Sequence, residues 1–193
     1  MEETKFNWYS VITESDELTQ GDIIINFPIL KTINYSELLE IANDEEFEAM
    51  IDVEYVDVII LTQPCDLKQA KPDLKSVILC RLHDVDSSGL GKSKLCEIVR
   101  GNTPQFYMLN EYGEFNYKDK DFELNTFNFH IANFNEIETV PVEALKKYAQ
   151  KIPKRLRLLP PYREHLSQAF AKYFMRIGLP SDIDKACFNK YTK

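Results

Sequence analysis

The sequence has few glycines and no long apolar run, and each shortage excludes a class of protein. Only six of its 193 residues are glycine, so long flexible linkers between domains are not expected. The longest continuous apolar stretch, residues 58–61, has the length of a strand and cannot span a bilayer. The first residues, MEETKFNWYS, are acidic and polar and lack the basic start and apolar middle of a secretory signal. We therefore predict one cytoplasmic domain, residues 1–193, that does not enter a membrane.

The chain also lacks a paired-cysteine motif, and its four cysteines are expected to be reduced thiols in the cytoplasm. Cys80 and His83 stand three apart on a predicted strand, so they would point to opposite faces and could not share a zinc ion. Residues 88–93, SGLGKS, imitate a phosphate-binding loop, but Asp86 stands where that pattern needs its first glycine. We therefore expect no metal ion and no cofactor. The zinc-type ligands considered are Cys65, Cys80, His83 and Cys96.

The net charge of −8 is distributed unevenly along the chain. Residues 146–176 hold nine basic residues and one acidic residue, so this stretch carries +8, whereas the rest of the chain carries −16. Such a basic stripe either faces an anionic partner, such as nucleic acid, or pairs with acidic groups of the protein itself or of a partner protein. Tyrosines among the cations are able to stack on bases. The residues predicted to contact a partner or nucleic acid are Lys154, Arg155, Arg157, Tyr162, Arg163, Lys172 and Arg176.

Alternating and continuous apolar segments predict a β-rich body at about residues 15–140. Gly21 provides a turn before the first strand, and Pro28 is expected at an edge or at the end of that strand. A short acidic helix is expected over residues 34–49 and a loop over residues 84–93. The expected strands cover residues 21–30, 50–62, 76–82, 106–109, 115–117 and 122–134.

The C-terminal part, about residues 141–180, is expected to be basic and helical, with a tail at 181–193. Pro161 stands where a helix begins and Gly178 where it ends, and an apolar stripe runs between them at helical spacing. Strands followed by a final helix predict an α+β fold: a small twisted antiparallel β-barrel or half-barrel with a C-terminal amphipathic helix packed on it. The stripe consists of Leu166, Ala169, Phe170, Tyr173, Phe174 and Ile177.

Three segments of the first half, QGDIIINFP, VDVIILTQPCDL and VILCRLHDV, come in an order that resembles the MazF/PemK family. The resemblance implies an SH3-like barrel and an RNA-cleaving toxin that pairs with an antitoxin. Thr62 matches the position of the family's turn hydroxyl. Acidic residues 34–48 replace the family's arginine loop, so its catalytic arginine has no counterpart here. The second half, with LLPPYREHLSQAFAKYFMRIGLP, resembles small uncharacterised proteins that carry a Thr/Ser-Gln-x-Cys-Asp turn, some of them beside phage-defence or ATPase genes.

The turn at residues 62–66, TQPCD, is the strongest local candidate for chemistry because it follows a buried strand. A nucleophilic cysteine needs a histidine beside it and a lowered pKa. His83 ends the predicted neighbouring strand, so the candidate catalytic residues are Cys65, Asp66 and His83. The alternative is a structural turn in which Asp66 binds backbone amides and Cys65 packs inward.

These observations support three functions. The first is a binding or adaptor module that docks on a larger protein or a nucleic acid, within a toxin–antitoxin or phage-defence cassette. The second is a metal-independent endoribonuclease, which needs a base near the 2′-hydroxyl and a cation near the scissile phosphate. The third is the cysteine enzyme described above. We favour the first, with a protein partner; whether the chain is an enzyme, and its oligomeric state, are left open. The residues available to a ribonuclease are His83 or His165 and Arg157, Arg163 or Arg176.

Overall fold

The computed structural model describes residues 6–31, 52–68, 74–119 and 122–175. Its centre is a seven-stranded sheet in the order β1-β9-β2-β3-β4-β8-β5, with all neighbouring strands antiparallel. The strands of this sheet are β1 (Tyr9–Thr13), β2 (Asp22–Leu30), β3 (Val53–Ile60), β4 (Ser76–Asp84), β5 (Phe106–Leu109), β8 (His130–Pro141) and β9 (Lys154–Leu158). A separate hairpin consists of β6 (Tyr117–Asp119) and β7 (Phe122–Leu124).

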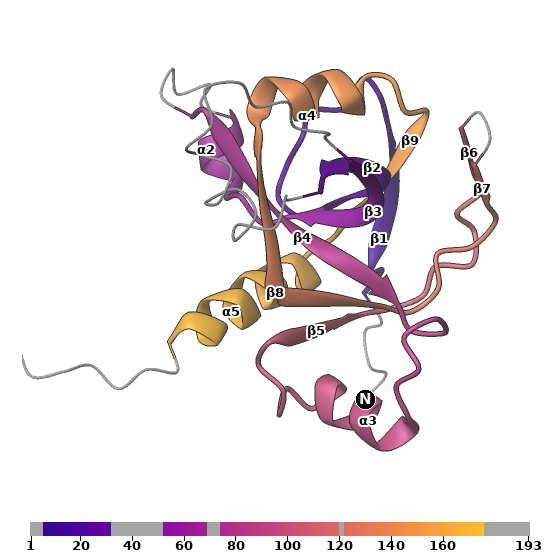
Figure 1. The fold of residues 1–193 in the computed structure, drawn as a ribbon, viewed down its shortest axis with the longest axis vertical. Coiled ribbons are helices and arrows are strands. Elements are labelled where there is room, and N and C mark those ends of the chain that lie inside the picture. The colour runs from indigo at the N-terminus through magenta and orange to yellow at the C-terminus, as the bar shows by residue number, and fades with distance from the viewer. Residues whose placement is uncertain (1–5, 32–51, 69–73, 120–121, 176–193) are drawn as a thin grey trace, which may run out of the picture.

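Four helices accompany the sheet within the described ranges. Figure 1 shows α4 across one end of the sheet and α5 beside β8. Of these helices, none is long and apolar enough to cross a membrane. The helices are α2 (Pro64–Lys68), α3 (Lys92–Val99), α4 (Val142–Ala149) and α5 (Tyr162–Phe174).

The predicted α+β class is confirmed: the fold is a largely antiparallel sheet with a C-terminal helix packed on it. The sheet bends strongly without closing, since β1 and β5 end the strand order and do not pair with each other among the described strands. A closed barrel is therefore not formed. One side-chain bond links the two ends, because the Tyr9 hydroxyl donates to the backbone oxygen of Asn110 at 2.7 Å.

The core forms between β2, β3 and β4, whose apolar side chains are buried on both faces of the sheet. Ile23, Ile24 and Ile25 of β2 are at most 1% exposed, and Leu145 of α4 and Leu166 of α5 are fully buried against the same core. Burial of this kind removes apolar surface from water and supplies most of the driving force for folding.

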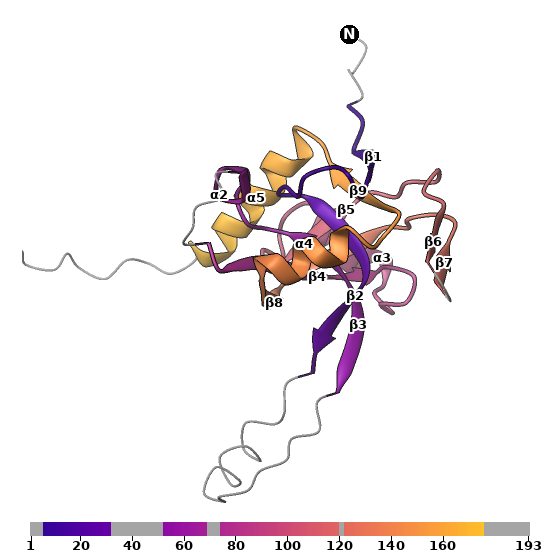
Figure 2. The same ribbon diagram turned by 90° about the horizontal axis from the view of Figure 1, so that it is seen from above.

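A bulge in β2 centres on Asn26, the one described non-glycine residue with a left-handed backbone, at φ +57°. Asparagine tolerates this conformation better than most residues. The Asn26 N–H donates to the Asp57 carboxylate at 2.8 Å, and the Tyr148 hydroxyl donates to the Asn26 carbonyl at 2.7 Å. Both backbone groups that the bulge removes from the ladder are therefore satisfied. Beyond it, the β2–β3 ribbon extends away from the body, as Figure 2 shows.

Several expected elements are corrected. The basic segment is not helical throughout, because residues 154–158 form β9 between β1 and β2; the helical part expected at 141–180 is α4, then β9, then α5. The single strand expected at 122–134 is β7 followed by the start of β8, and the strand expected at 115–117 begins only at Tyr117. The expected helix at 34–49, the cap at Gly178 and the tail at 181–193 lie outside the described residues.

Candidate functional site

The turn at residues 62–66 does not form the predicted cysteine–histidine pair. The Thr62 hydroxyl accepts a hydrogen bond from the Ile78 N–H at 2.7 Å, which fixes the turn beside the start of β4. His83 stands five residues further along β4, which corresponds to about 17 Å of extended chain. The structure therefore does not bring Cys65 and His83 together. Pro64 begins the short helix α2, which contains Cys65 and Asp66.

The described cysteines differ in exposure, and this predicts their reactivity. Cys65 is exposed, whereas burial raises the pKa of the Cys80 thiol to about 12. Iodoacetamide at pH 8 is expected to alkylate Cys65 at least roughly tenfold faster than Cys80, because the thiolate is the reacting form. Peptide mapping by mass spectrometry measures both rates.

The same labelling tests the cysteine-enzyme hypothesis, with the urea-unfolded chain as the control. Cys65 is expected to react no faster in the folded chain than in urea, since His83 lies at the far end of β4. Faster labelling of Cys65 in the folded chain would show an activated thiol and contradict this account.

Two of the predicted partner-binding arginines serve the fold instead. Arg157 on β9 holds Asp22 on β2 with two bonds, from Nε to Oδ1 at 2.6 Å and from Nη2 to Oδ2 at 3.0 Å. Arg155 is 1% exposed and donates to the backbone oxygens of Asp16 and Ala149 at 2.8 and 3.3 Å. The prediction that these arginines face a binding partner is therefore wrong for Arg155. The charge of Arg157 is neutralised by Asp22.

Burial has the largest effect on the pKa values of two members of this cluster, Asp22 and Arg155. Asp22 is fully buried, and burial raises the pKa of its carboxyl even though Arg157 acts in the opposite direction. Burial likewise lowers the pKa of the Arg155 guanidinium. The Arg155 Nε lies 3.7 Å from the Asp22 carboxylate and has no hydrogen-bond partner among the described atoms. The cluster is thus a buried ion-pair network that depends on every member.

Of the other predicted contact residues, Tyr162, Arg163 and Lys172 lie on α5, whereas Lys154 begins β9. Arg163 pairs with Glu164 at 2.7 Å, and Lys154 is partly buried. Tyr162 and Lys172 both line the same cleft, whereas Arg176 lies outside the described residues. The structure therefore brings together Tyr162 and Lys172 from the predicted set.

This cleft has a volume of about 480 Å³ and lies between the N-terminal segment, α3, β5 and α5. Five aromatic rings line it, from Trp8, Phe106, Tyr107, Phe129 and Tyr162. Its lining residues include two basic side chains and no aspartate or glutamate. The remaining lining residues are Ile98, Val99, Gly101, Pro104, Met108, Asn110, His165, Ala169 and Lys172. We call this feature the aromatic cleft.

Stacking and hydrogen bonds fix one wall of the aromatic cleft. The rings of Trp8 and Tyr162 stack with centroids 3.7 Å apart and planes inclined by 11°. The Tyr107 hydroxyl donates to the Tyr162 carbonyl at 3.3 Å, and burial raises the Tyr107 pKa. The rim is more open, since Phe129 is 40% exposed and Val99 68% exposed. A rigid aromatic wall beside an exposed apolar rim is typical of a binding site.

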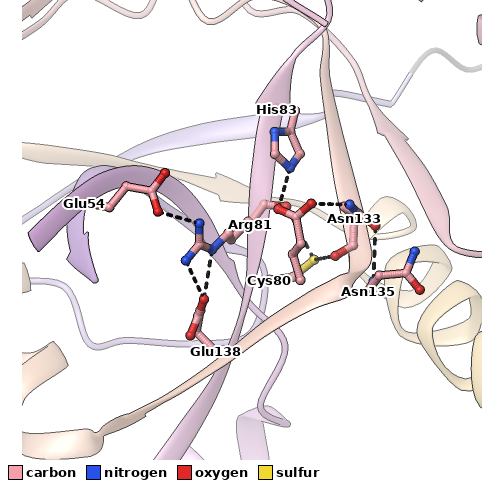
Figure 3. Close-up of polar contacts among 8 residues, drawn as sticks. Glu54, Cys80, Arg81, His83, Asn133, Asn135 and Glu138 are labelled. Atoms are coloured by element: carbon pink, nitrogen blue, oxygen red, sulfur yellow. Dashed lines mark hydrogen bonds and ion pairs between the residues drawn. The ribbon is translucent and has the colours of Figure 1, made fainter. Parts of the chain in front are cut away.

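A second polar feature lies where β8 bends over β4, shown in Figure 3. Cys80 faces Ile137 and Leu82 faces Ala132, so four residues of β8 stand opposite Arg81 alone. This wide bulge changes the direction of the side chains at the corner of the sheet. We call the polar residues around it the corner network. Its members are Glu54, Cys80, Arg81, His83, Asn133, Asn135, Glu136 and Glu138.

The corner network is internally paired. His83 Nε2 lies 2.8 Å from the Glu136 carboxylate, which also accepts from the Asn133 amide at 2.6 Å. Arg81 bridges Glu54 and Glu138 at 2.9 and 2.7 Å. An imidazole held by a carboxylate has the parts for proton transfer. Arg81, however, is neutralised by two carboxylates, and within the described ranges no cluster of ligands suited to a metal ion is found.

No protein-family model, no curated protein and no solved structure matches the chain.

Sequence reasoning missed most of the aromatic cleft. It selected Tyr162 and Lys172 for their basic surroundings, but not Trp8, Phe106 or Phe129. The one signal available was the single tryptophan of the chain, which lies in a polar N-terminal segment rather than in an apolar strand. Tryptophan is enriched at interfaces because its ring is apolar and its N–H is polar.

Proposed function

We propose that the protein is a binding module that docks on a partner protein through the aromatic cleft. The observation that carries this proposal is the lining of the cleft, which combines five aromatic rings with two basic side chains and no carboxylate. We expect an aromatic or large apolar side chain of the partner to fill such a site, with a carboxylate beside it attracted by Lys172. The partner segment therefore carries an aromatic anchor next to an acidic residue.

Charge favours a protein partner over nucleic acid. Nucleic-acid affinity grows with the number of phosphates that free cations contact. Here the chain carries −8, and Arg155 and Arg157 are held in the buried network. Arg163 and Arg100 each pair with a glutamate, so Lys172 is the cleft's one lysine or arginine in the described part of the chain. A single lysine does not offset the acidic body.

The wider setting belongs to the same proposal. The open, bent antiparallel sheet supports an SH3-like half-barrel as the finer fold class. A place in a toxin–antitoxin cassette rests on the resemblance of residues 20–28, 56–67 and 77–85. A place beside phage-defence genes rests on the resemblance of the second half, with residues 158–180. Residence in the cytoplasm is part of the same proposal. The endoribonuclease alternative has an acid–base pair in His83 and Glu136 but lacks an unpaired arginine beside it among the described residues.

A random peptide library, displayed on phage and panned against the full chain, tests the proposal. Enriched peptides are expected to carry an aromatic residue beside Asp or Glu. Ala169→Trp fills the cleft from α5 and is expected to weaken the best peptide by roughly tenfold or more, because a central anchor contributes about 2 kcal/mol. Isothermal titration calorimetry measures the affinities.

Gln168→Trp is the matched control, since it places the same side chain one position away on the exposed side of α5. This variant is expected to bind like the unmodified chain, and circular dichroism checks that both variants fold. Enriched peptides without an aromatic residue, or equal binding by Ala169→Trp, would rule out the cleft as the docking site.

A further inference from the structure

The strand β5 ends the sheet, and its outer edge has no partner strand among the described residues. It pairs only with β8, with Phe106 opposite Asn133 and Leu109 opposite His130. An exposed edge presents backbone N–H and C=O groups that are able to pair with another chain. Which groups point outward follows from the antiparallel ladder.

The hydrogen bond from Phe134 N–H to the Gln105 carbonyl, at 2.8 Å, identifies these two residues as a hydrogen-bonded pair. In an antiparallel ladder hydrogen-bonded pairs alternate with non-hydrogen-bonded pairs. Tyr107 therefore directs its backbone groups to β8, whereas Phe106 and Met108 direct theirs to the free edge. Asn110 follows the same alternation: its carbonyl faces the free edge, where it accepts a hydrogen bond from the Tyr9 hydroxyl.

One of the outward groups is already satisfied within the chain. The Phe106 N–H donates to the Thr103 carbonyl at 2.9 Å. The ladder leaves the Phe106 carbonyl and both backbone groups of Met108 facing outward, without a partner strand in the described ranges. The free edge thus offers one donor between two acceptors.

The aromatic cleft runs along this edge. Side chains alternate between the two faces of a strand, yet the consecutive residues Phe106, Tyr107 and Met108 all line the cleft. A cleft that touches both faces of a strand lies at its edge. Figure 1 shows β5 between α5 and α3, which supply the two walls.

We propose that a partner segment binds in an extended conformation and adds to β5 as a further strand of the sheet, with its aromatic anchor in the cleft. This inference rests on the function proposed above and names the form of the partner. Main-chain bonds to an edge strand give affinity, and a pocket beside the strand selects the side chain. The charge of the lining adds an acidic residue next to the anchor, toward Lys172.

A second copy of this chain is a less suitable occupant. Each copy carries β5 on the floor of its own cleft, between α3 and α5. The β5 segment, FYML, carries no acidic residue that could meet Lys172 in the cleft of a second copy. A second β5 edge therefore fits the charge of the cleft less well than an acidic segment does.

The variants Met108→Pro and Met108→Ala separate the backbone bond from the side chain. Both remove the methionine side chain from the cleft, but only proline removes the outward N–H. Proline is tolerated here because edge strands accept it where the N–H faces away from the ladder. Met108→Pro is expected to bind the selected peptide roughly three- to tenfold more weakly than Met108→Ala, as for loss of one hydrogen bond.

Backbone N-methylation of the selected peptide provides a second test that changes no residue of the protein. Two sets of peptides are methylated at alternate amides. In one set the methyl groups block the peptide edge that faces β5, and in the other they block the peptide edge that faces solvent. Strand addition predicts that one set of methylated peptides loses binding and the other keeps it. Equal binding by both sets would overturn strand addition, and so would equal affinities of the two Met108 variants.

The failure of this inference is distinct from the failure of the proposed function. If Ala169→Trp abolishes binding while both N-methylated sets bind equally, the cleft binds an anchor without strand addition. If no peptide binds the unmodified chain, the proposed function fails first. Sedimentation velocity adds the remaining outcome: a dimer that Met108→Pro dissociates and Met108→Ala keeps would make a second copy the occupant and overturn the inference.

Discussion

Asp22→Ala is expected to lower the free energy of unfolding by about 3–5 kcal/mol, the usual cost of removing one partner of a buried ion pair. The substitution leaves Arg155, which is 1% exposed, without its nearest counter-charge, and it removes both hydrogen bonds between Arg157 and the Asp22 carboxylate. The Thr19 N–H also loses its acceptor, since it donates to the Asp22 carboxylate at 3.2 Å. Urea unfolding followed by circular dichroism measures the change.

Asp52→Ala is the control for this experiment. Asp52 forms an exposed ion pair with Lys31 at 3.7 Å, and its side chain is 75% exposed. Surface substitutions of this kind usually change stability by less than about 0.5 kcal/mol. A cost below about 1 kcal/mol for Asp22→Ala would show that the buried network does not hold β2 against β9.

Leu166→Ala is expected to lower the free energy of unfolding by about 2–5 kcal/mol, because it leaves a cavity beneath α5. Leu166 is the fully buried residue of this helix and packs into the core cluster. The same helix supplies Tyr162, Ala169 and Lys172 to the aromatic cleft, so its loosening also weakens peptide binding. Thermal and urea unfolding, with calorimetry of the selected peptide, measure both effects.

The control for Leu166→Ala is Gln168→Ala on the exposed side of the same helix. Alanine is the best helix former, so this change is expected to be neutral or slightly stabilising. Equal stability of the two variants would show that α5 is not anchored through Leu166, and would remove the physical basis for α5 as a wall of the cleft.

The sequence predicted those elements whose pattern is local. The strand at residues 106–109 was predicted with the observed bounds, and the strands at 21–30, 50–62 and 76–82 correspond to β2, β3 and β4. Their apolar runs are long enough to show the period of a strand. The start of α5 was predicted from Pro161, which directly precedes its first residue.

The errors come from interactions between distant parts of the chain. Residues 155–158, RLRL, alternate cation and leucine, but they fall in the part predicted to be basic and helical, residues 141–180. The carboxylate that neutralises Arg157 is 135 residues away, so the burial of these cations is not visible in their own segment. The aromatic cleft was missed for the same reason: Tyr162 meets the N-terminal segment across 156 residues, at the Phe6 carbonyl.

Trp8 provides the most direct test of the central claim, because it is the single tryptophan of the chain and lines the aromatic cleft. Titrating the full chain with the selected peptide, made with tyrosine or phenylalanine as its anchor, is expected to change Trp8 fluorescence to saturation. The same peptide with alanine at the anchor is expected to leave the emission unchanged. Binding detected by calorimetry without any change in Trp8 emission would place the partner elsewhere and contradict the account.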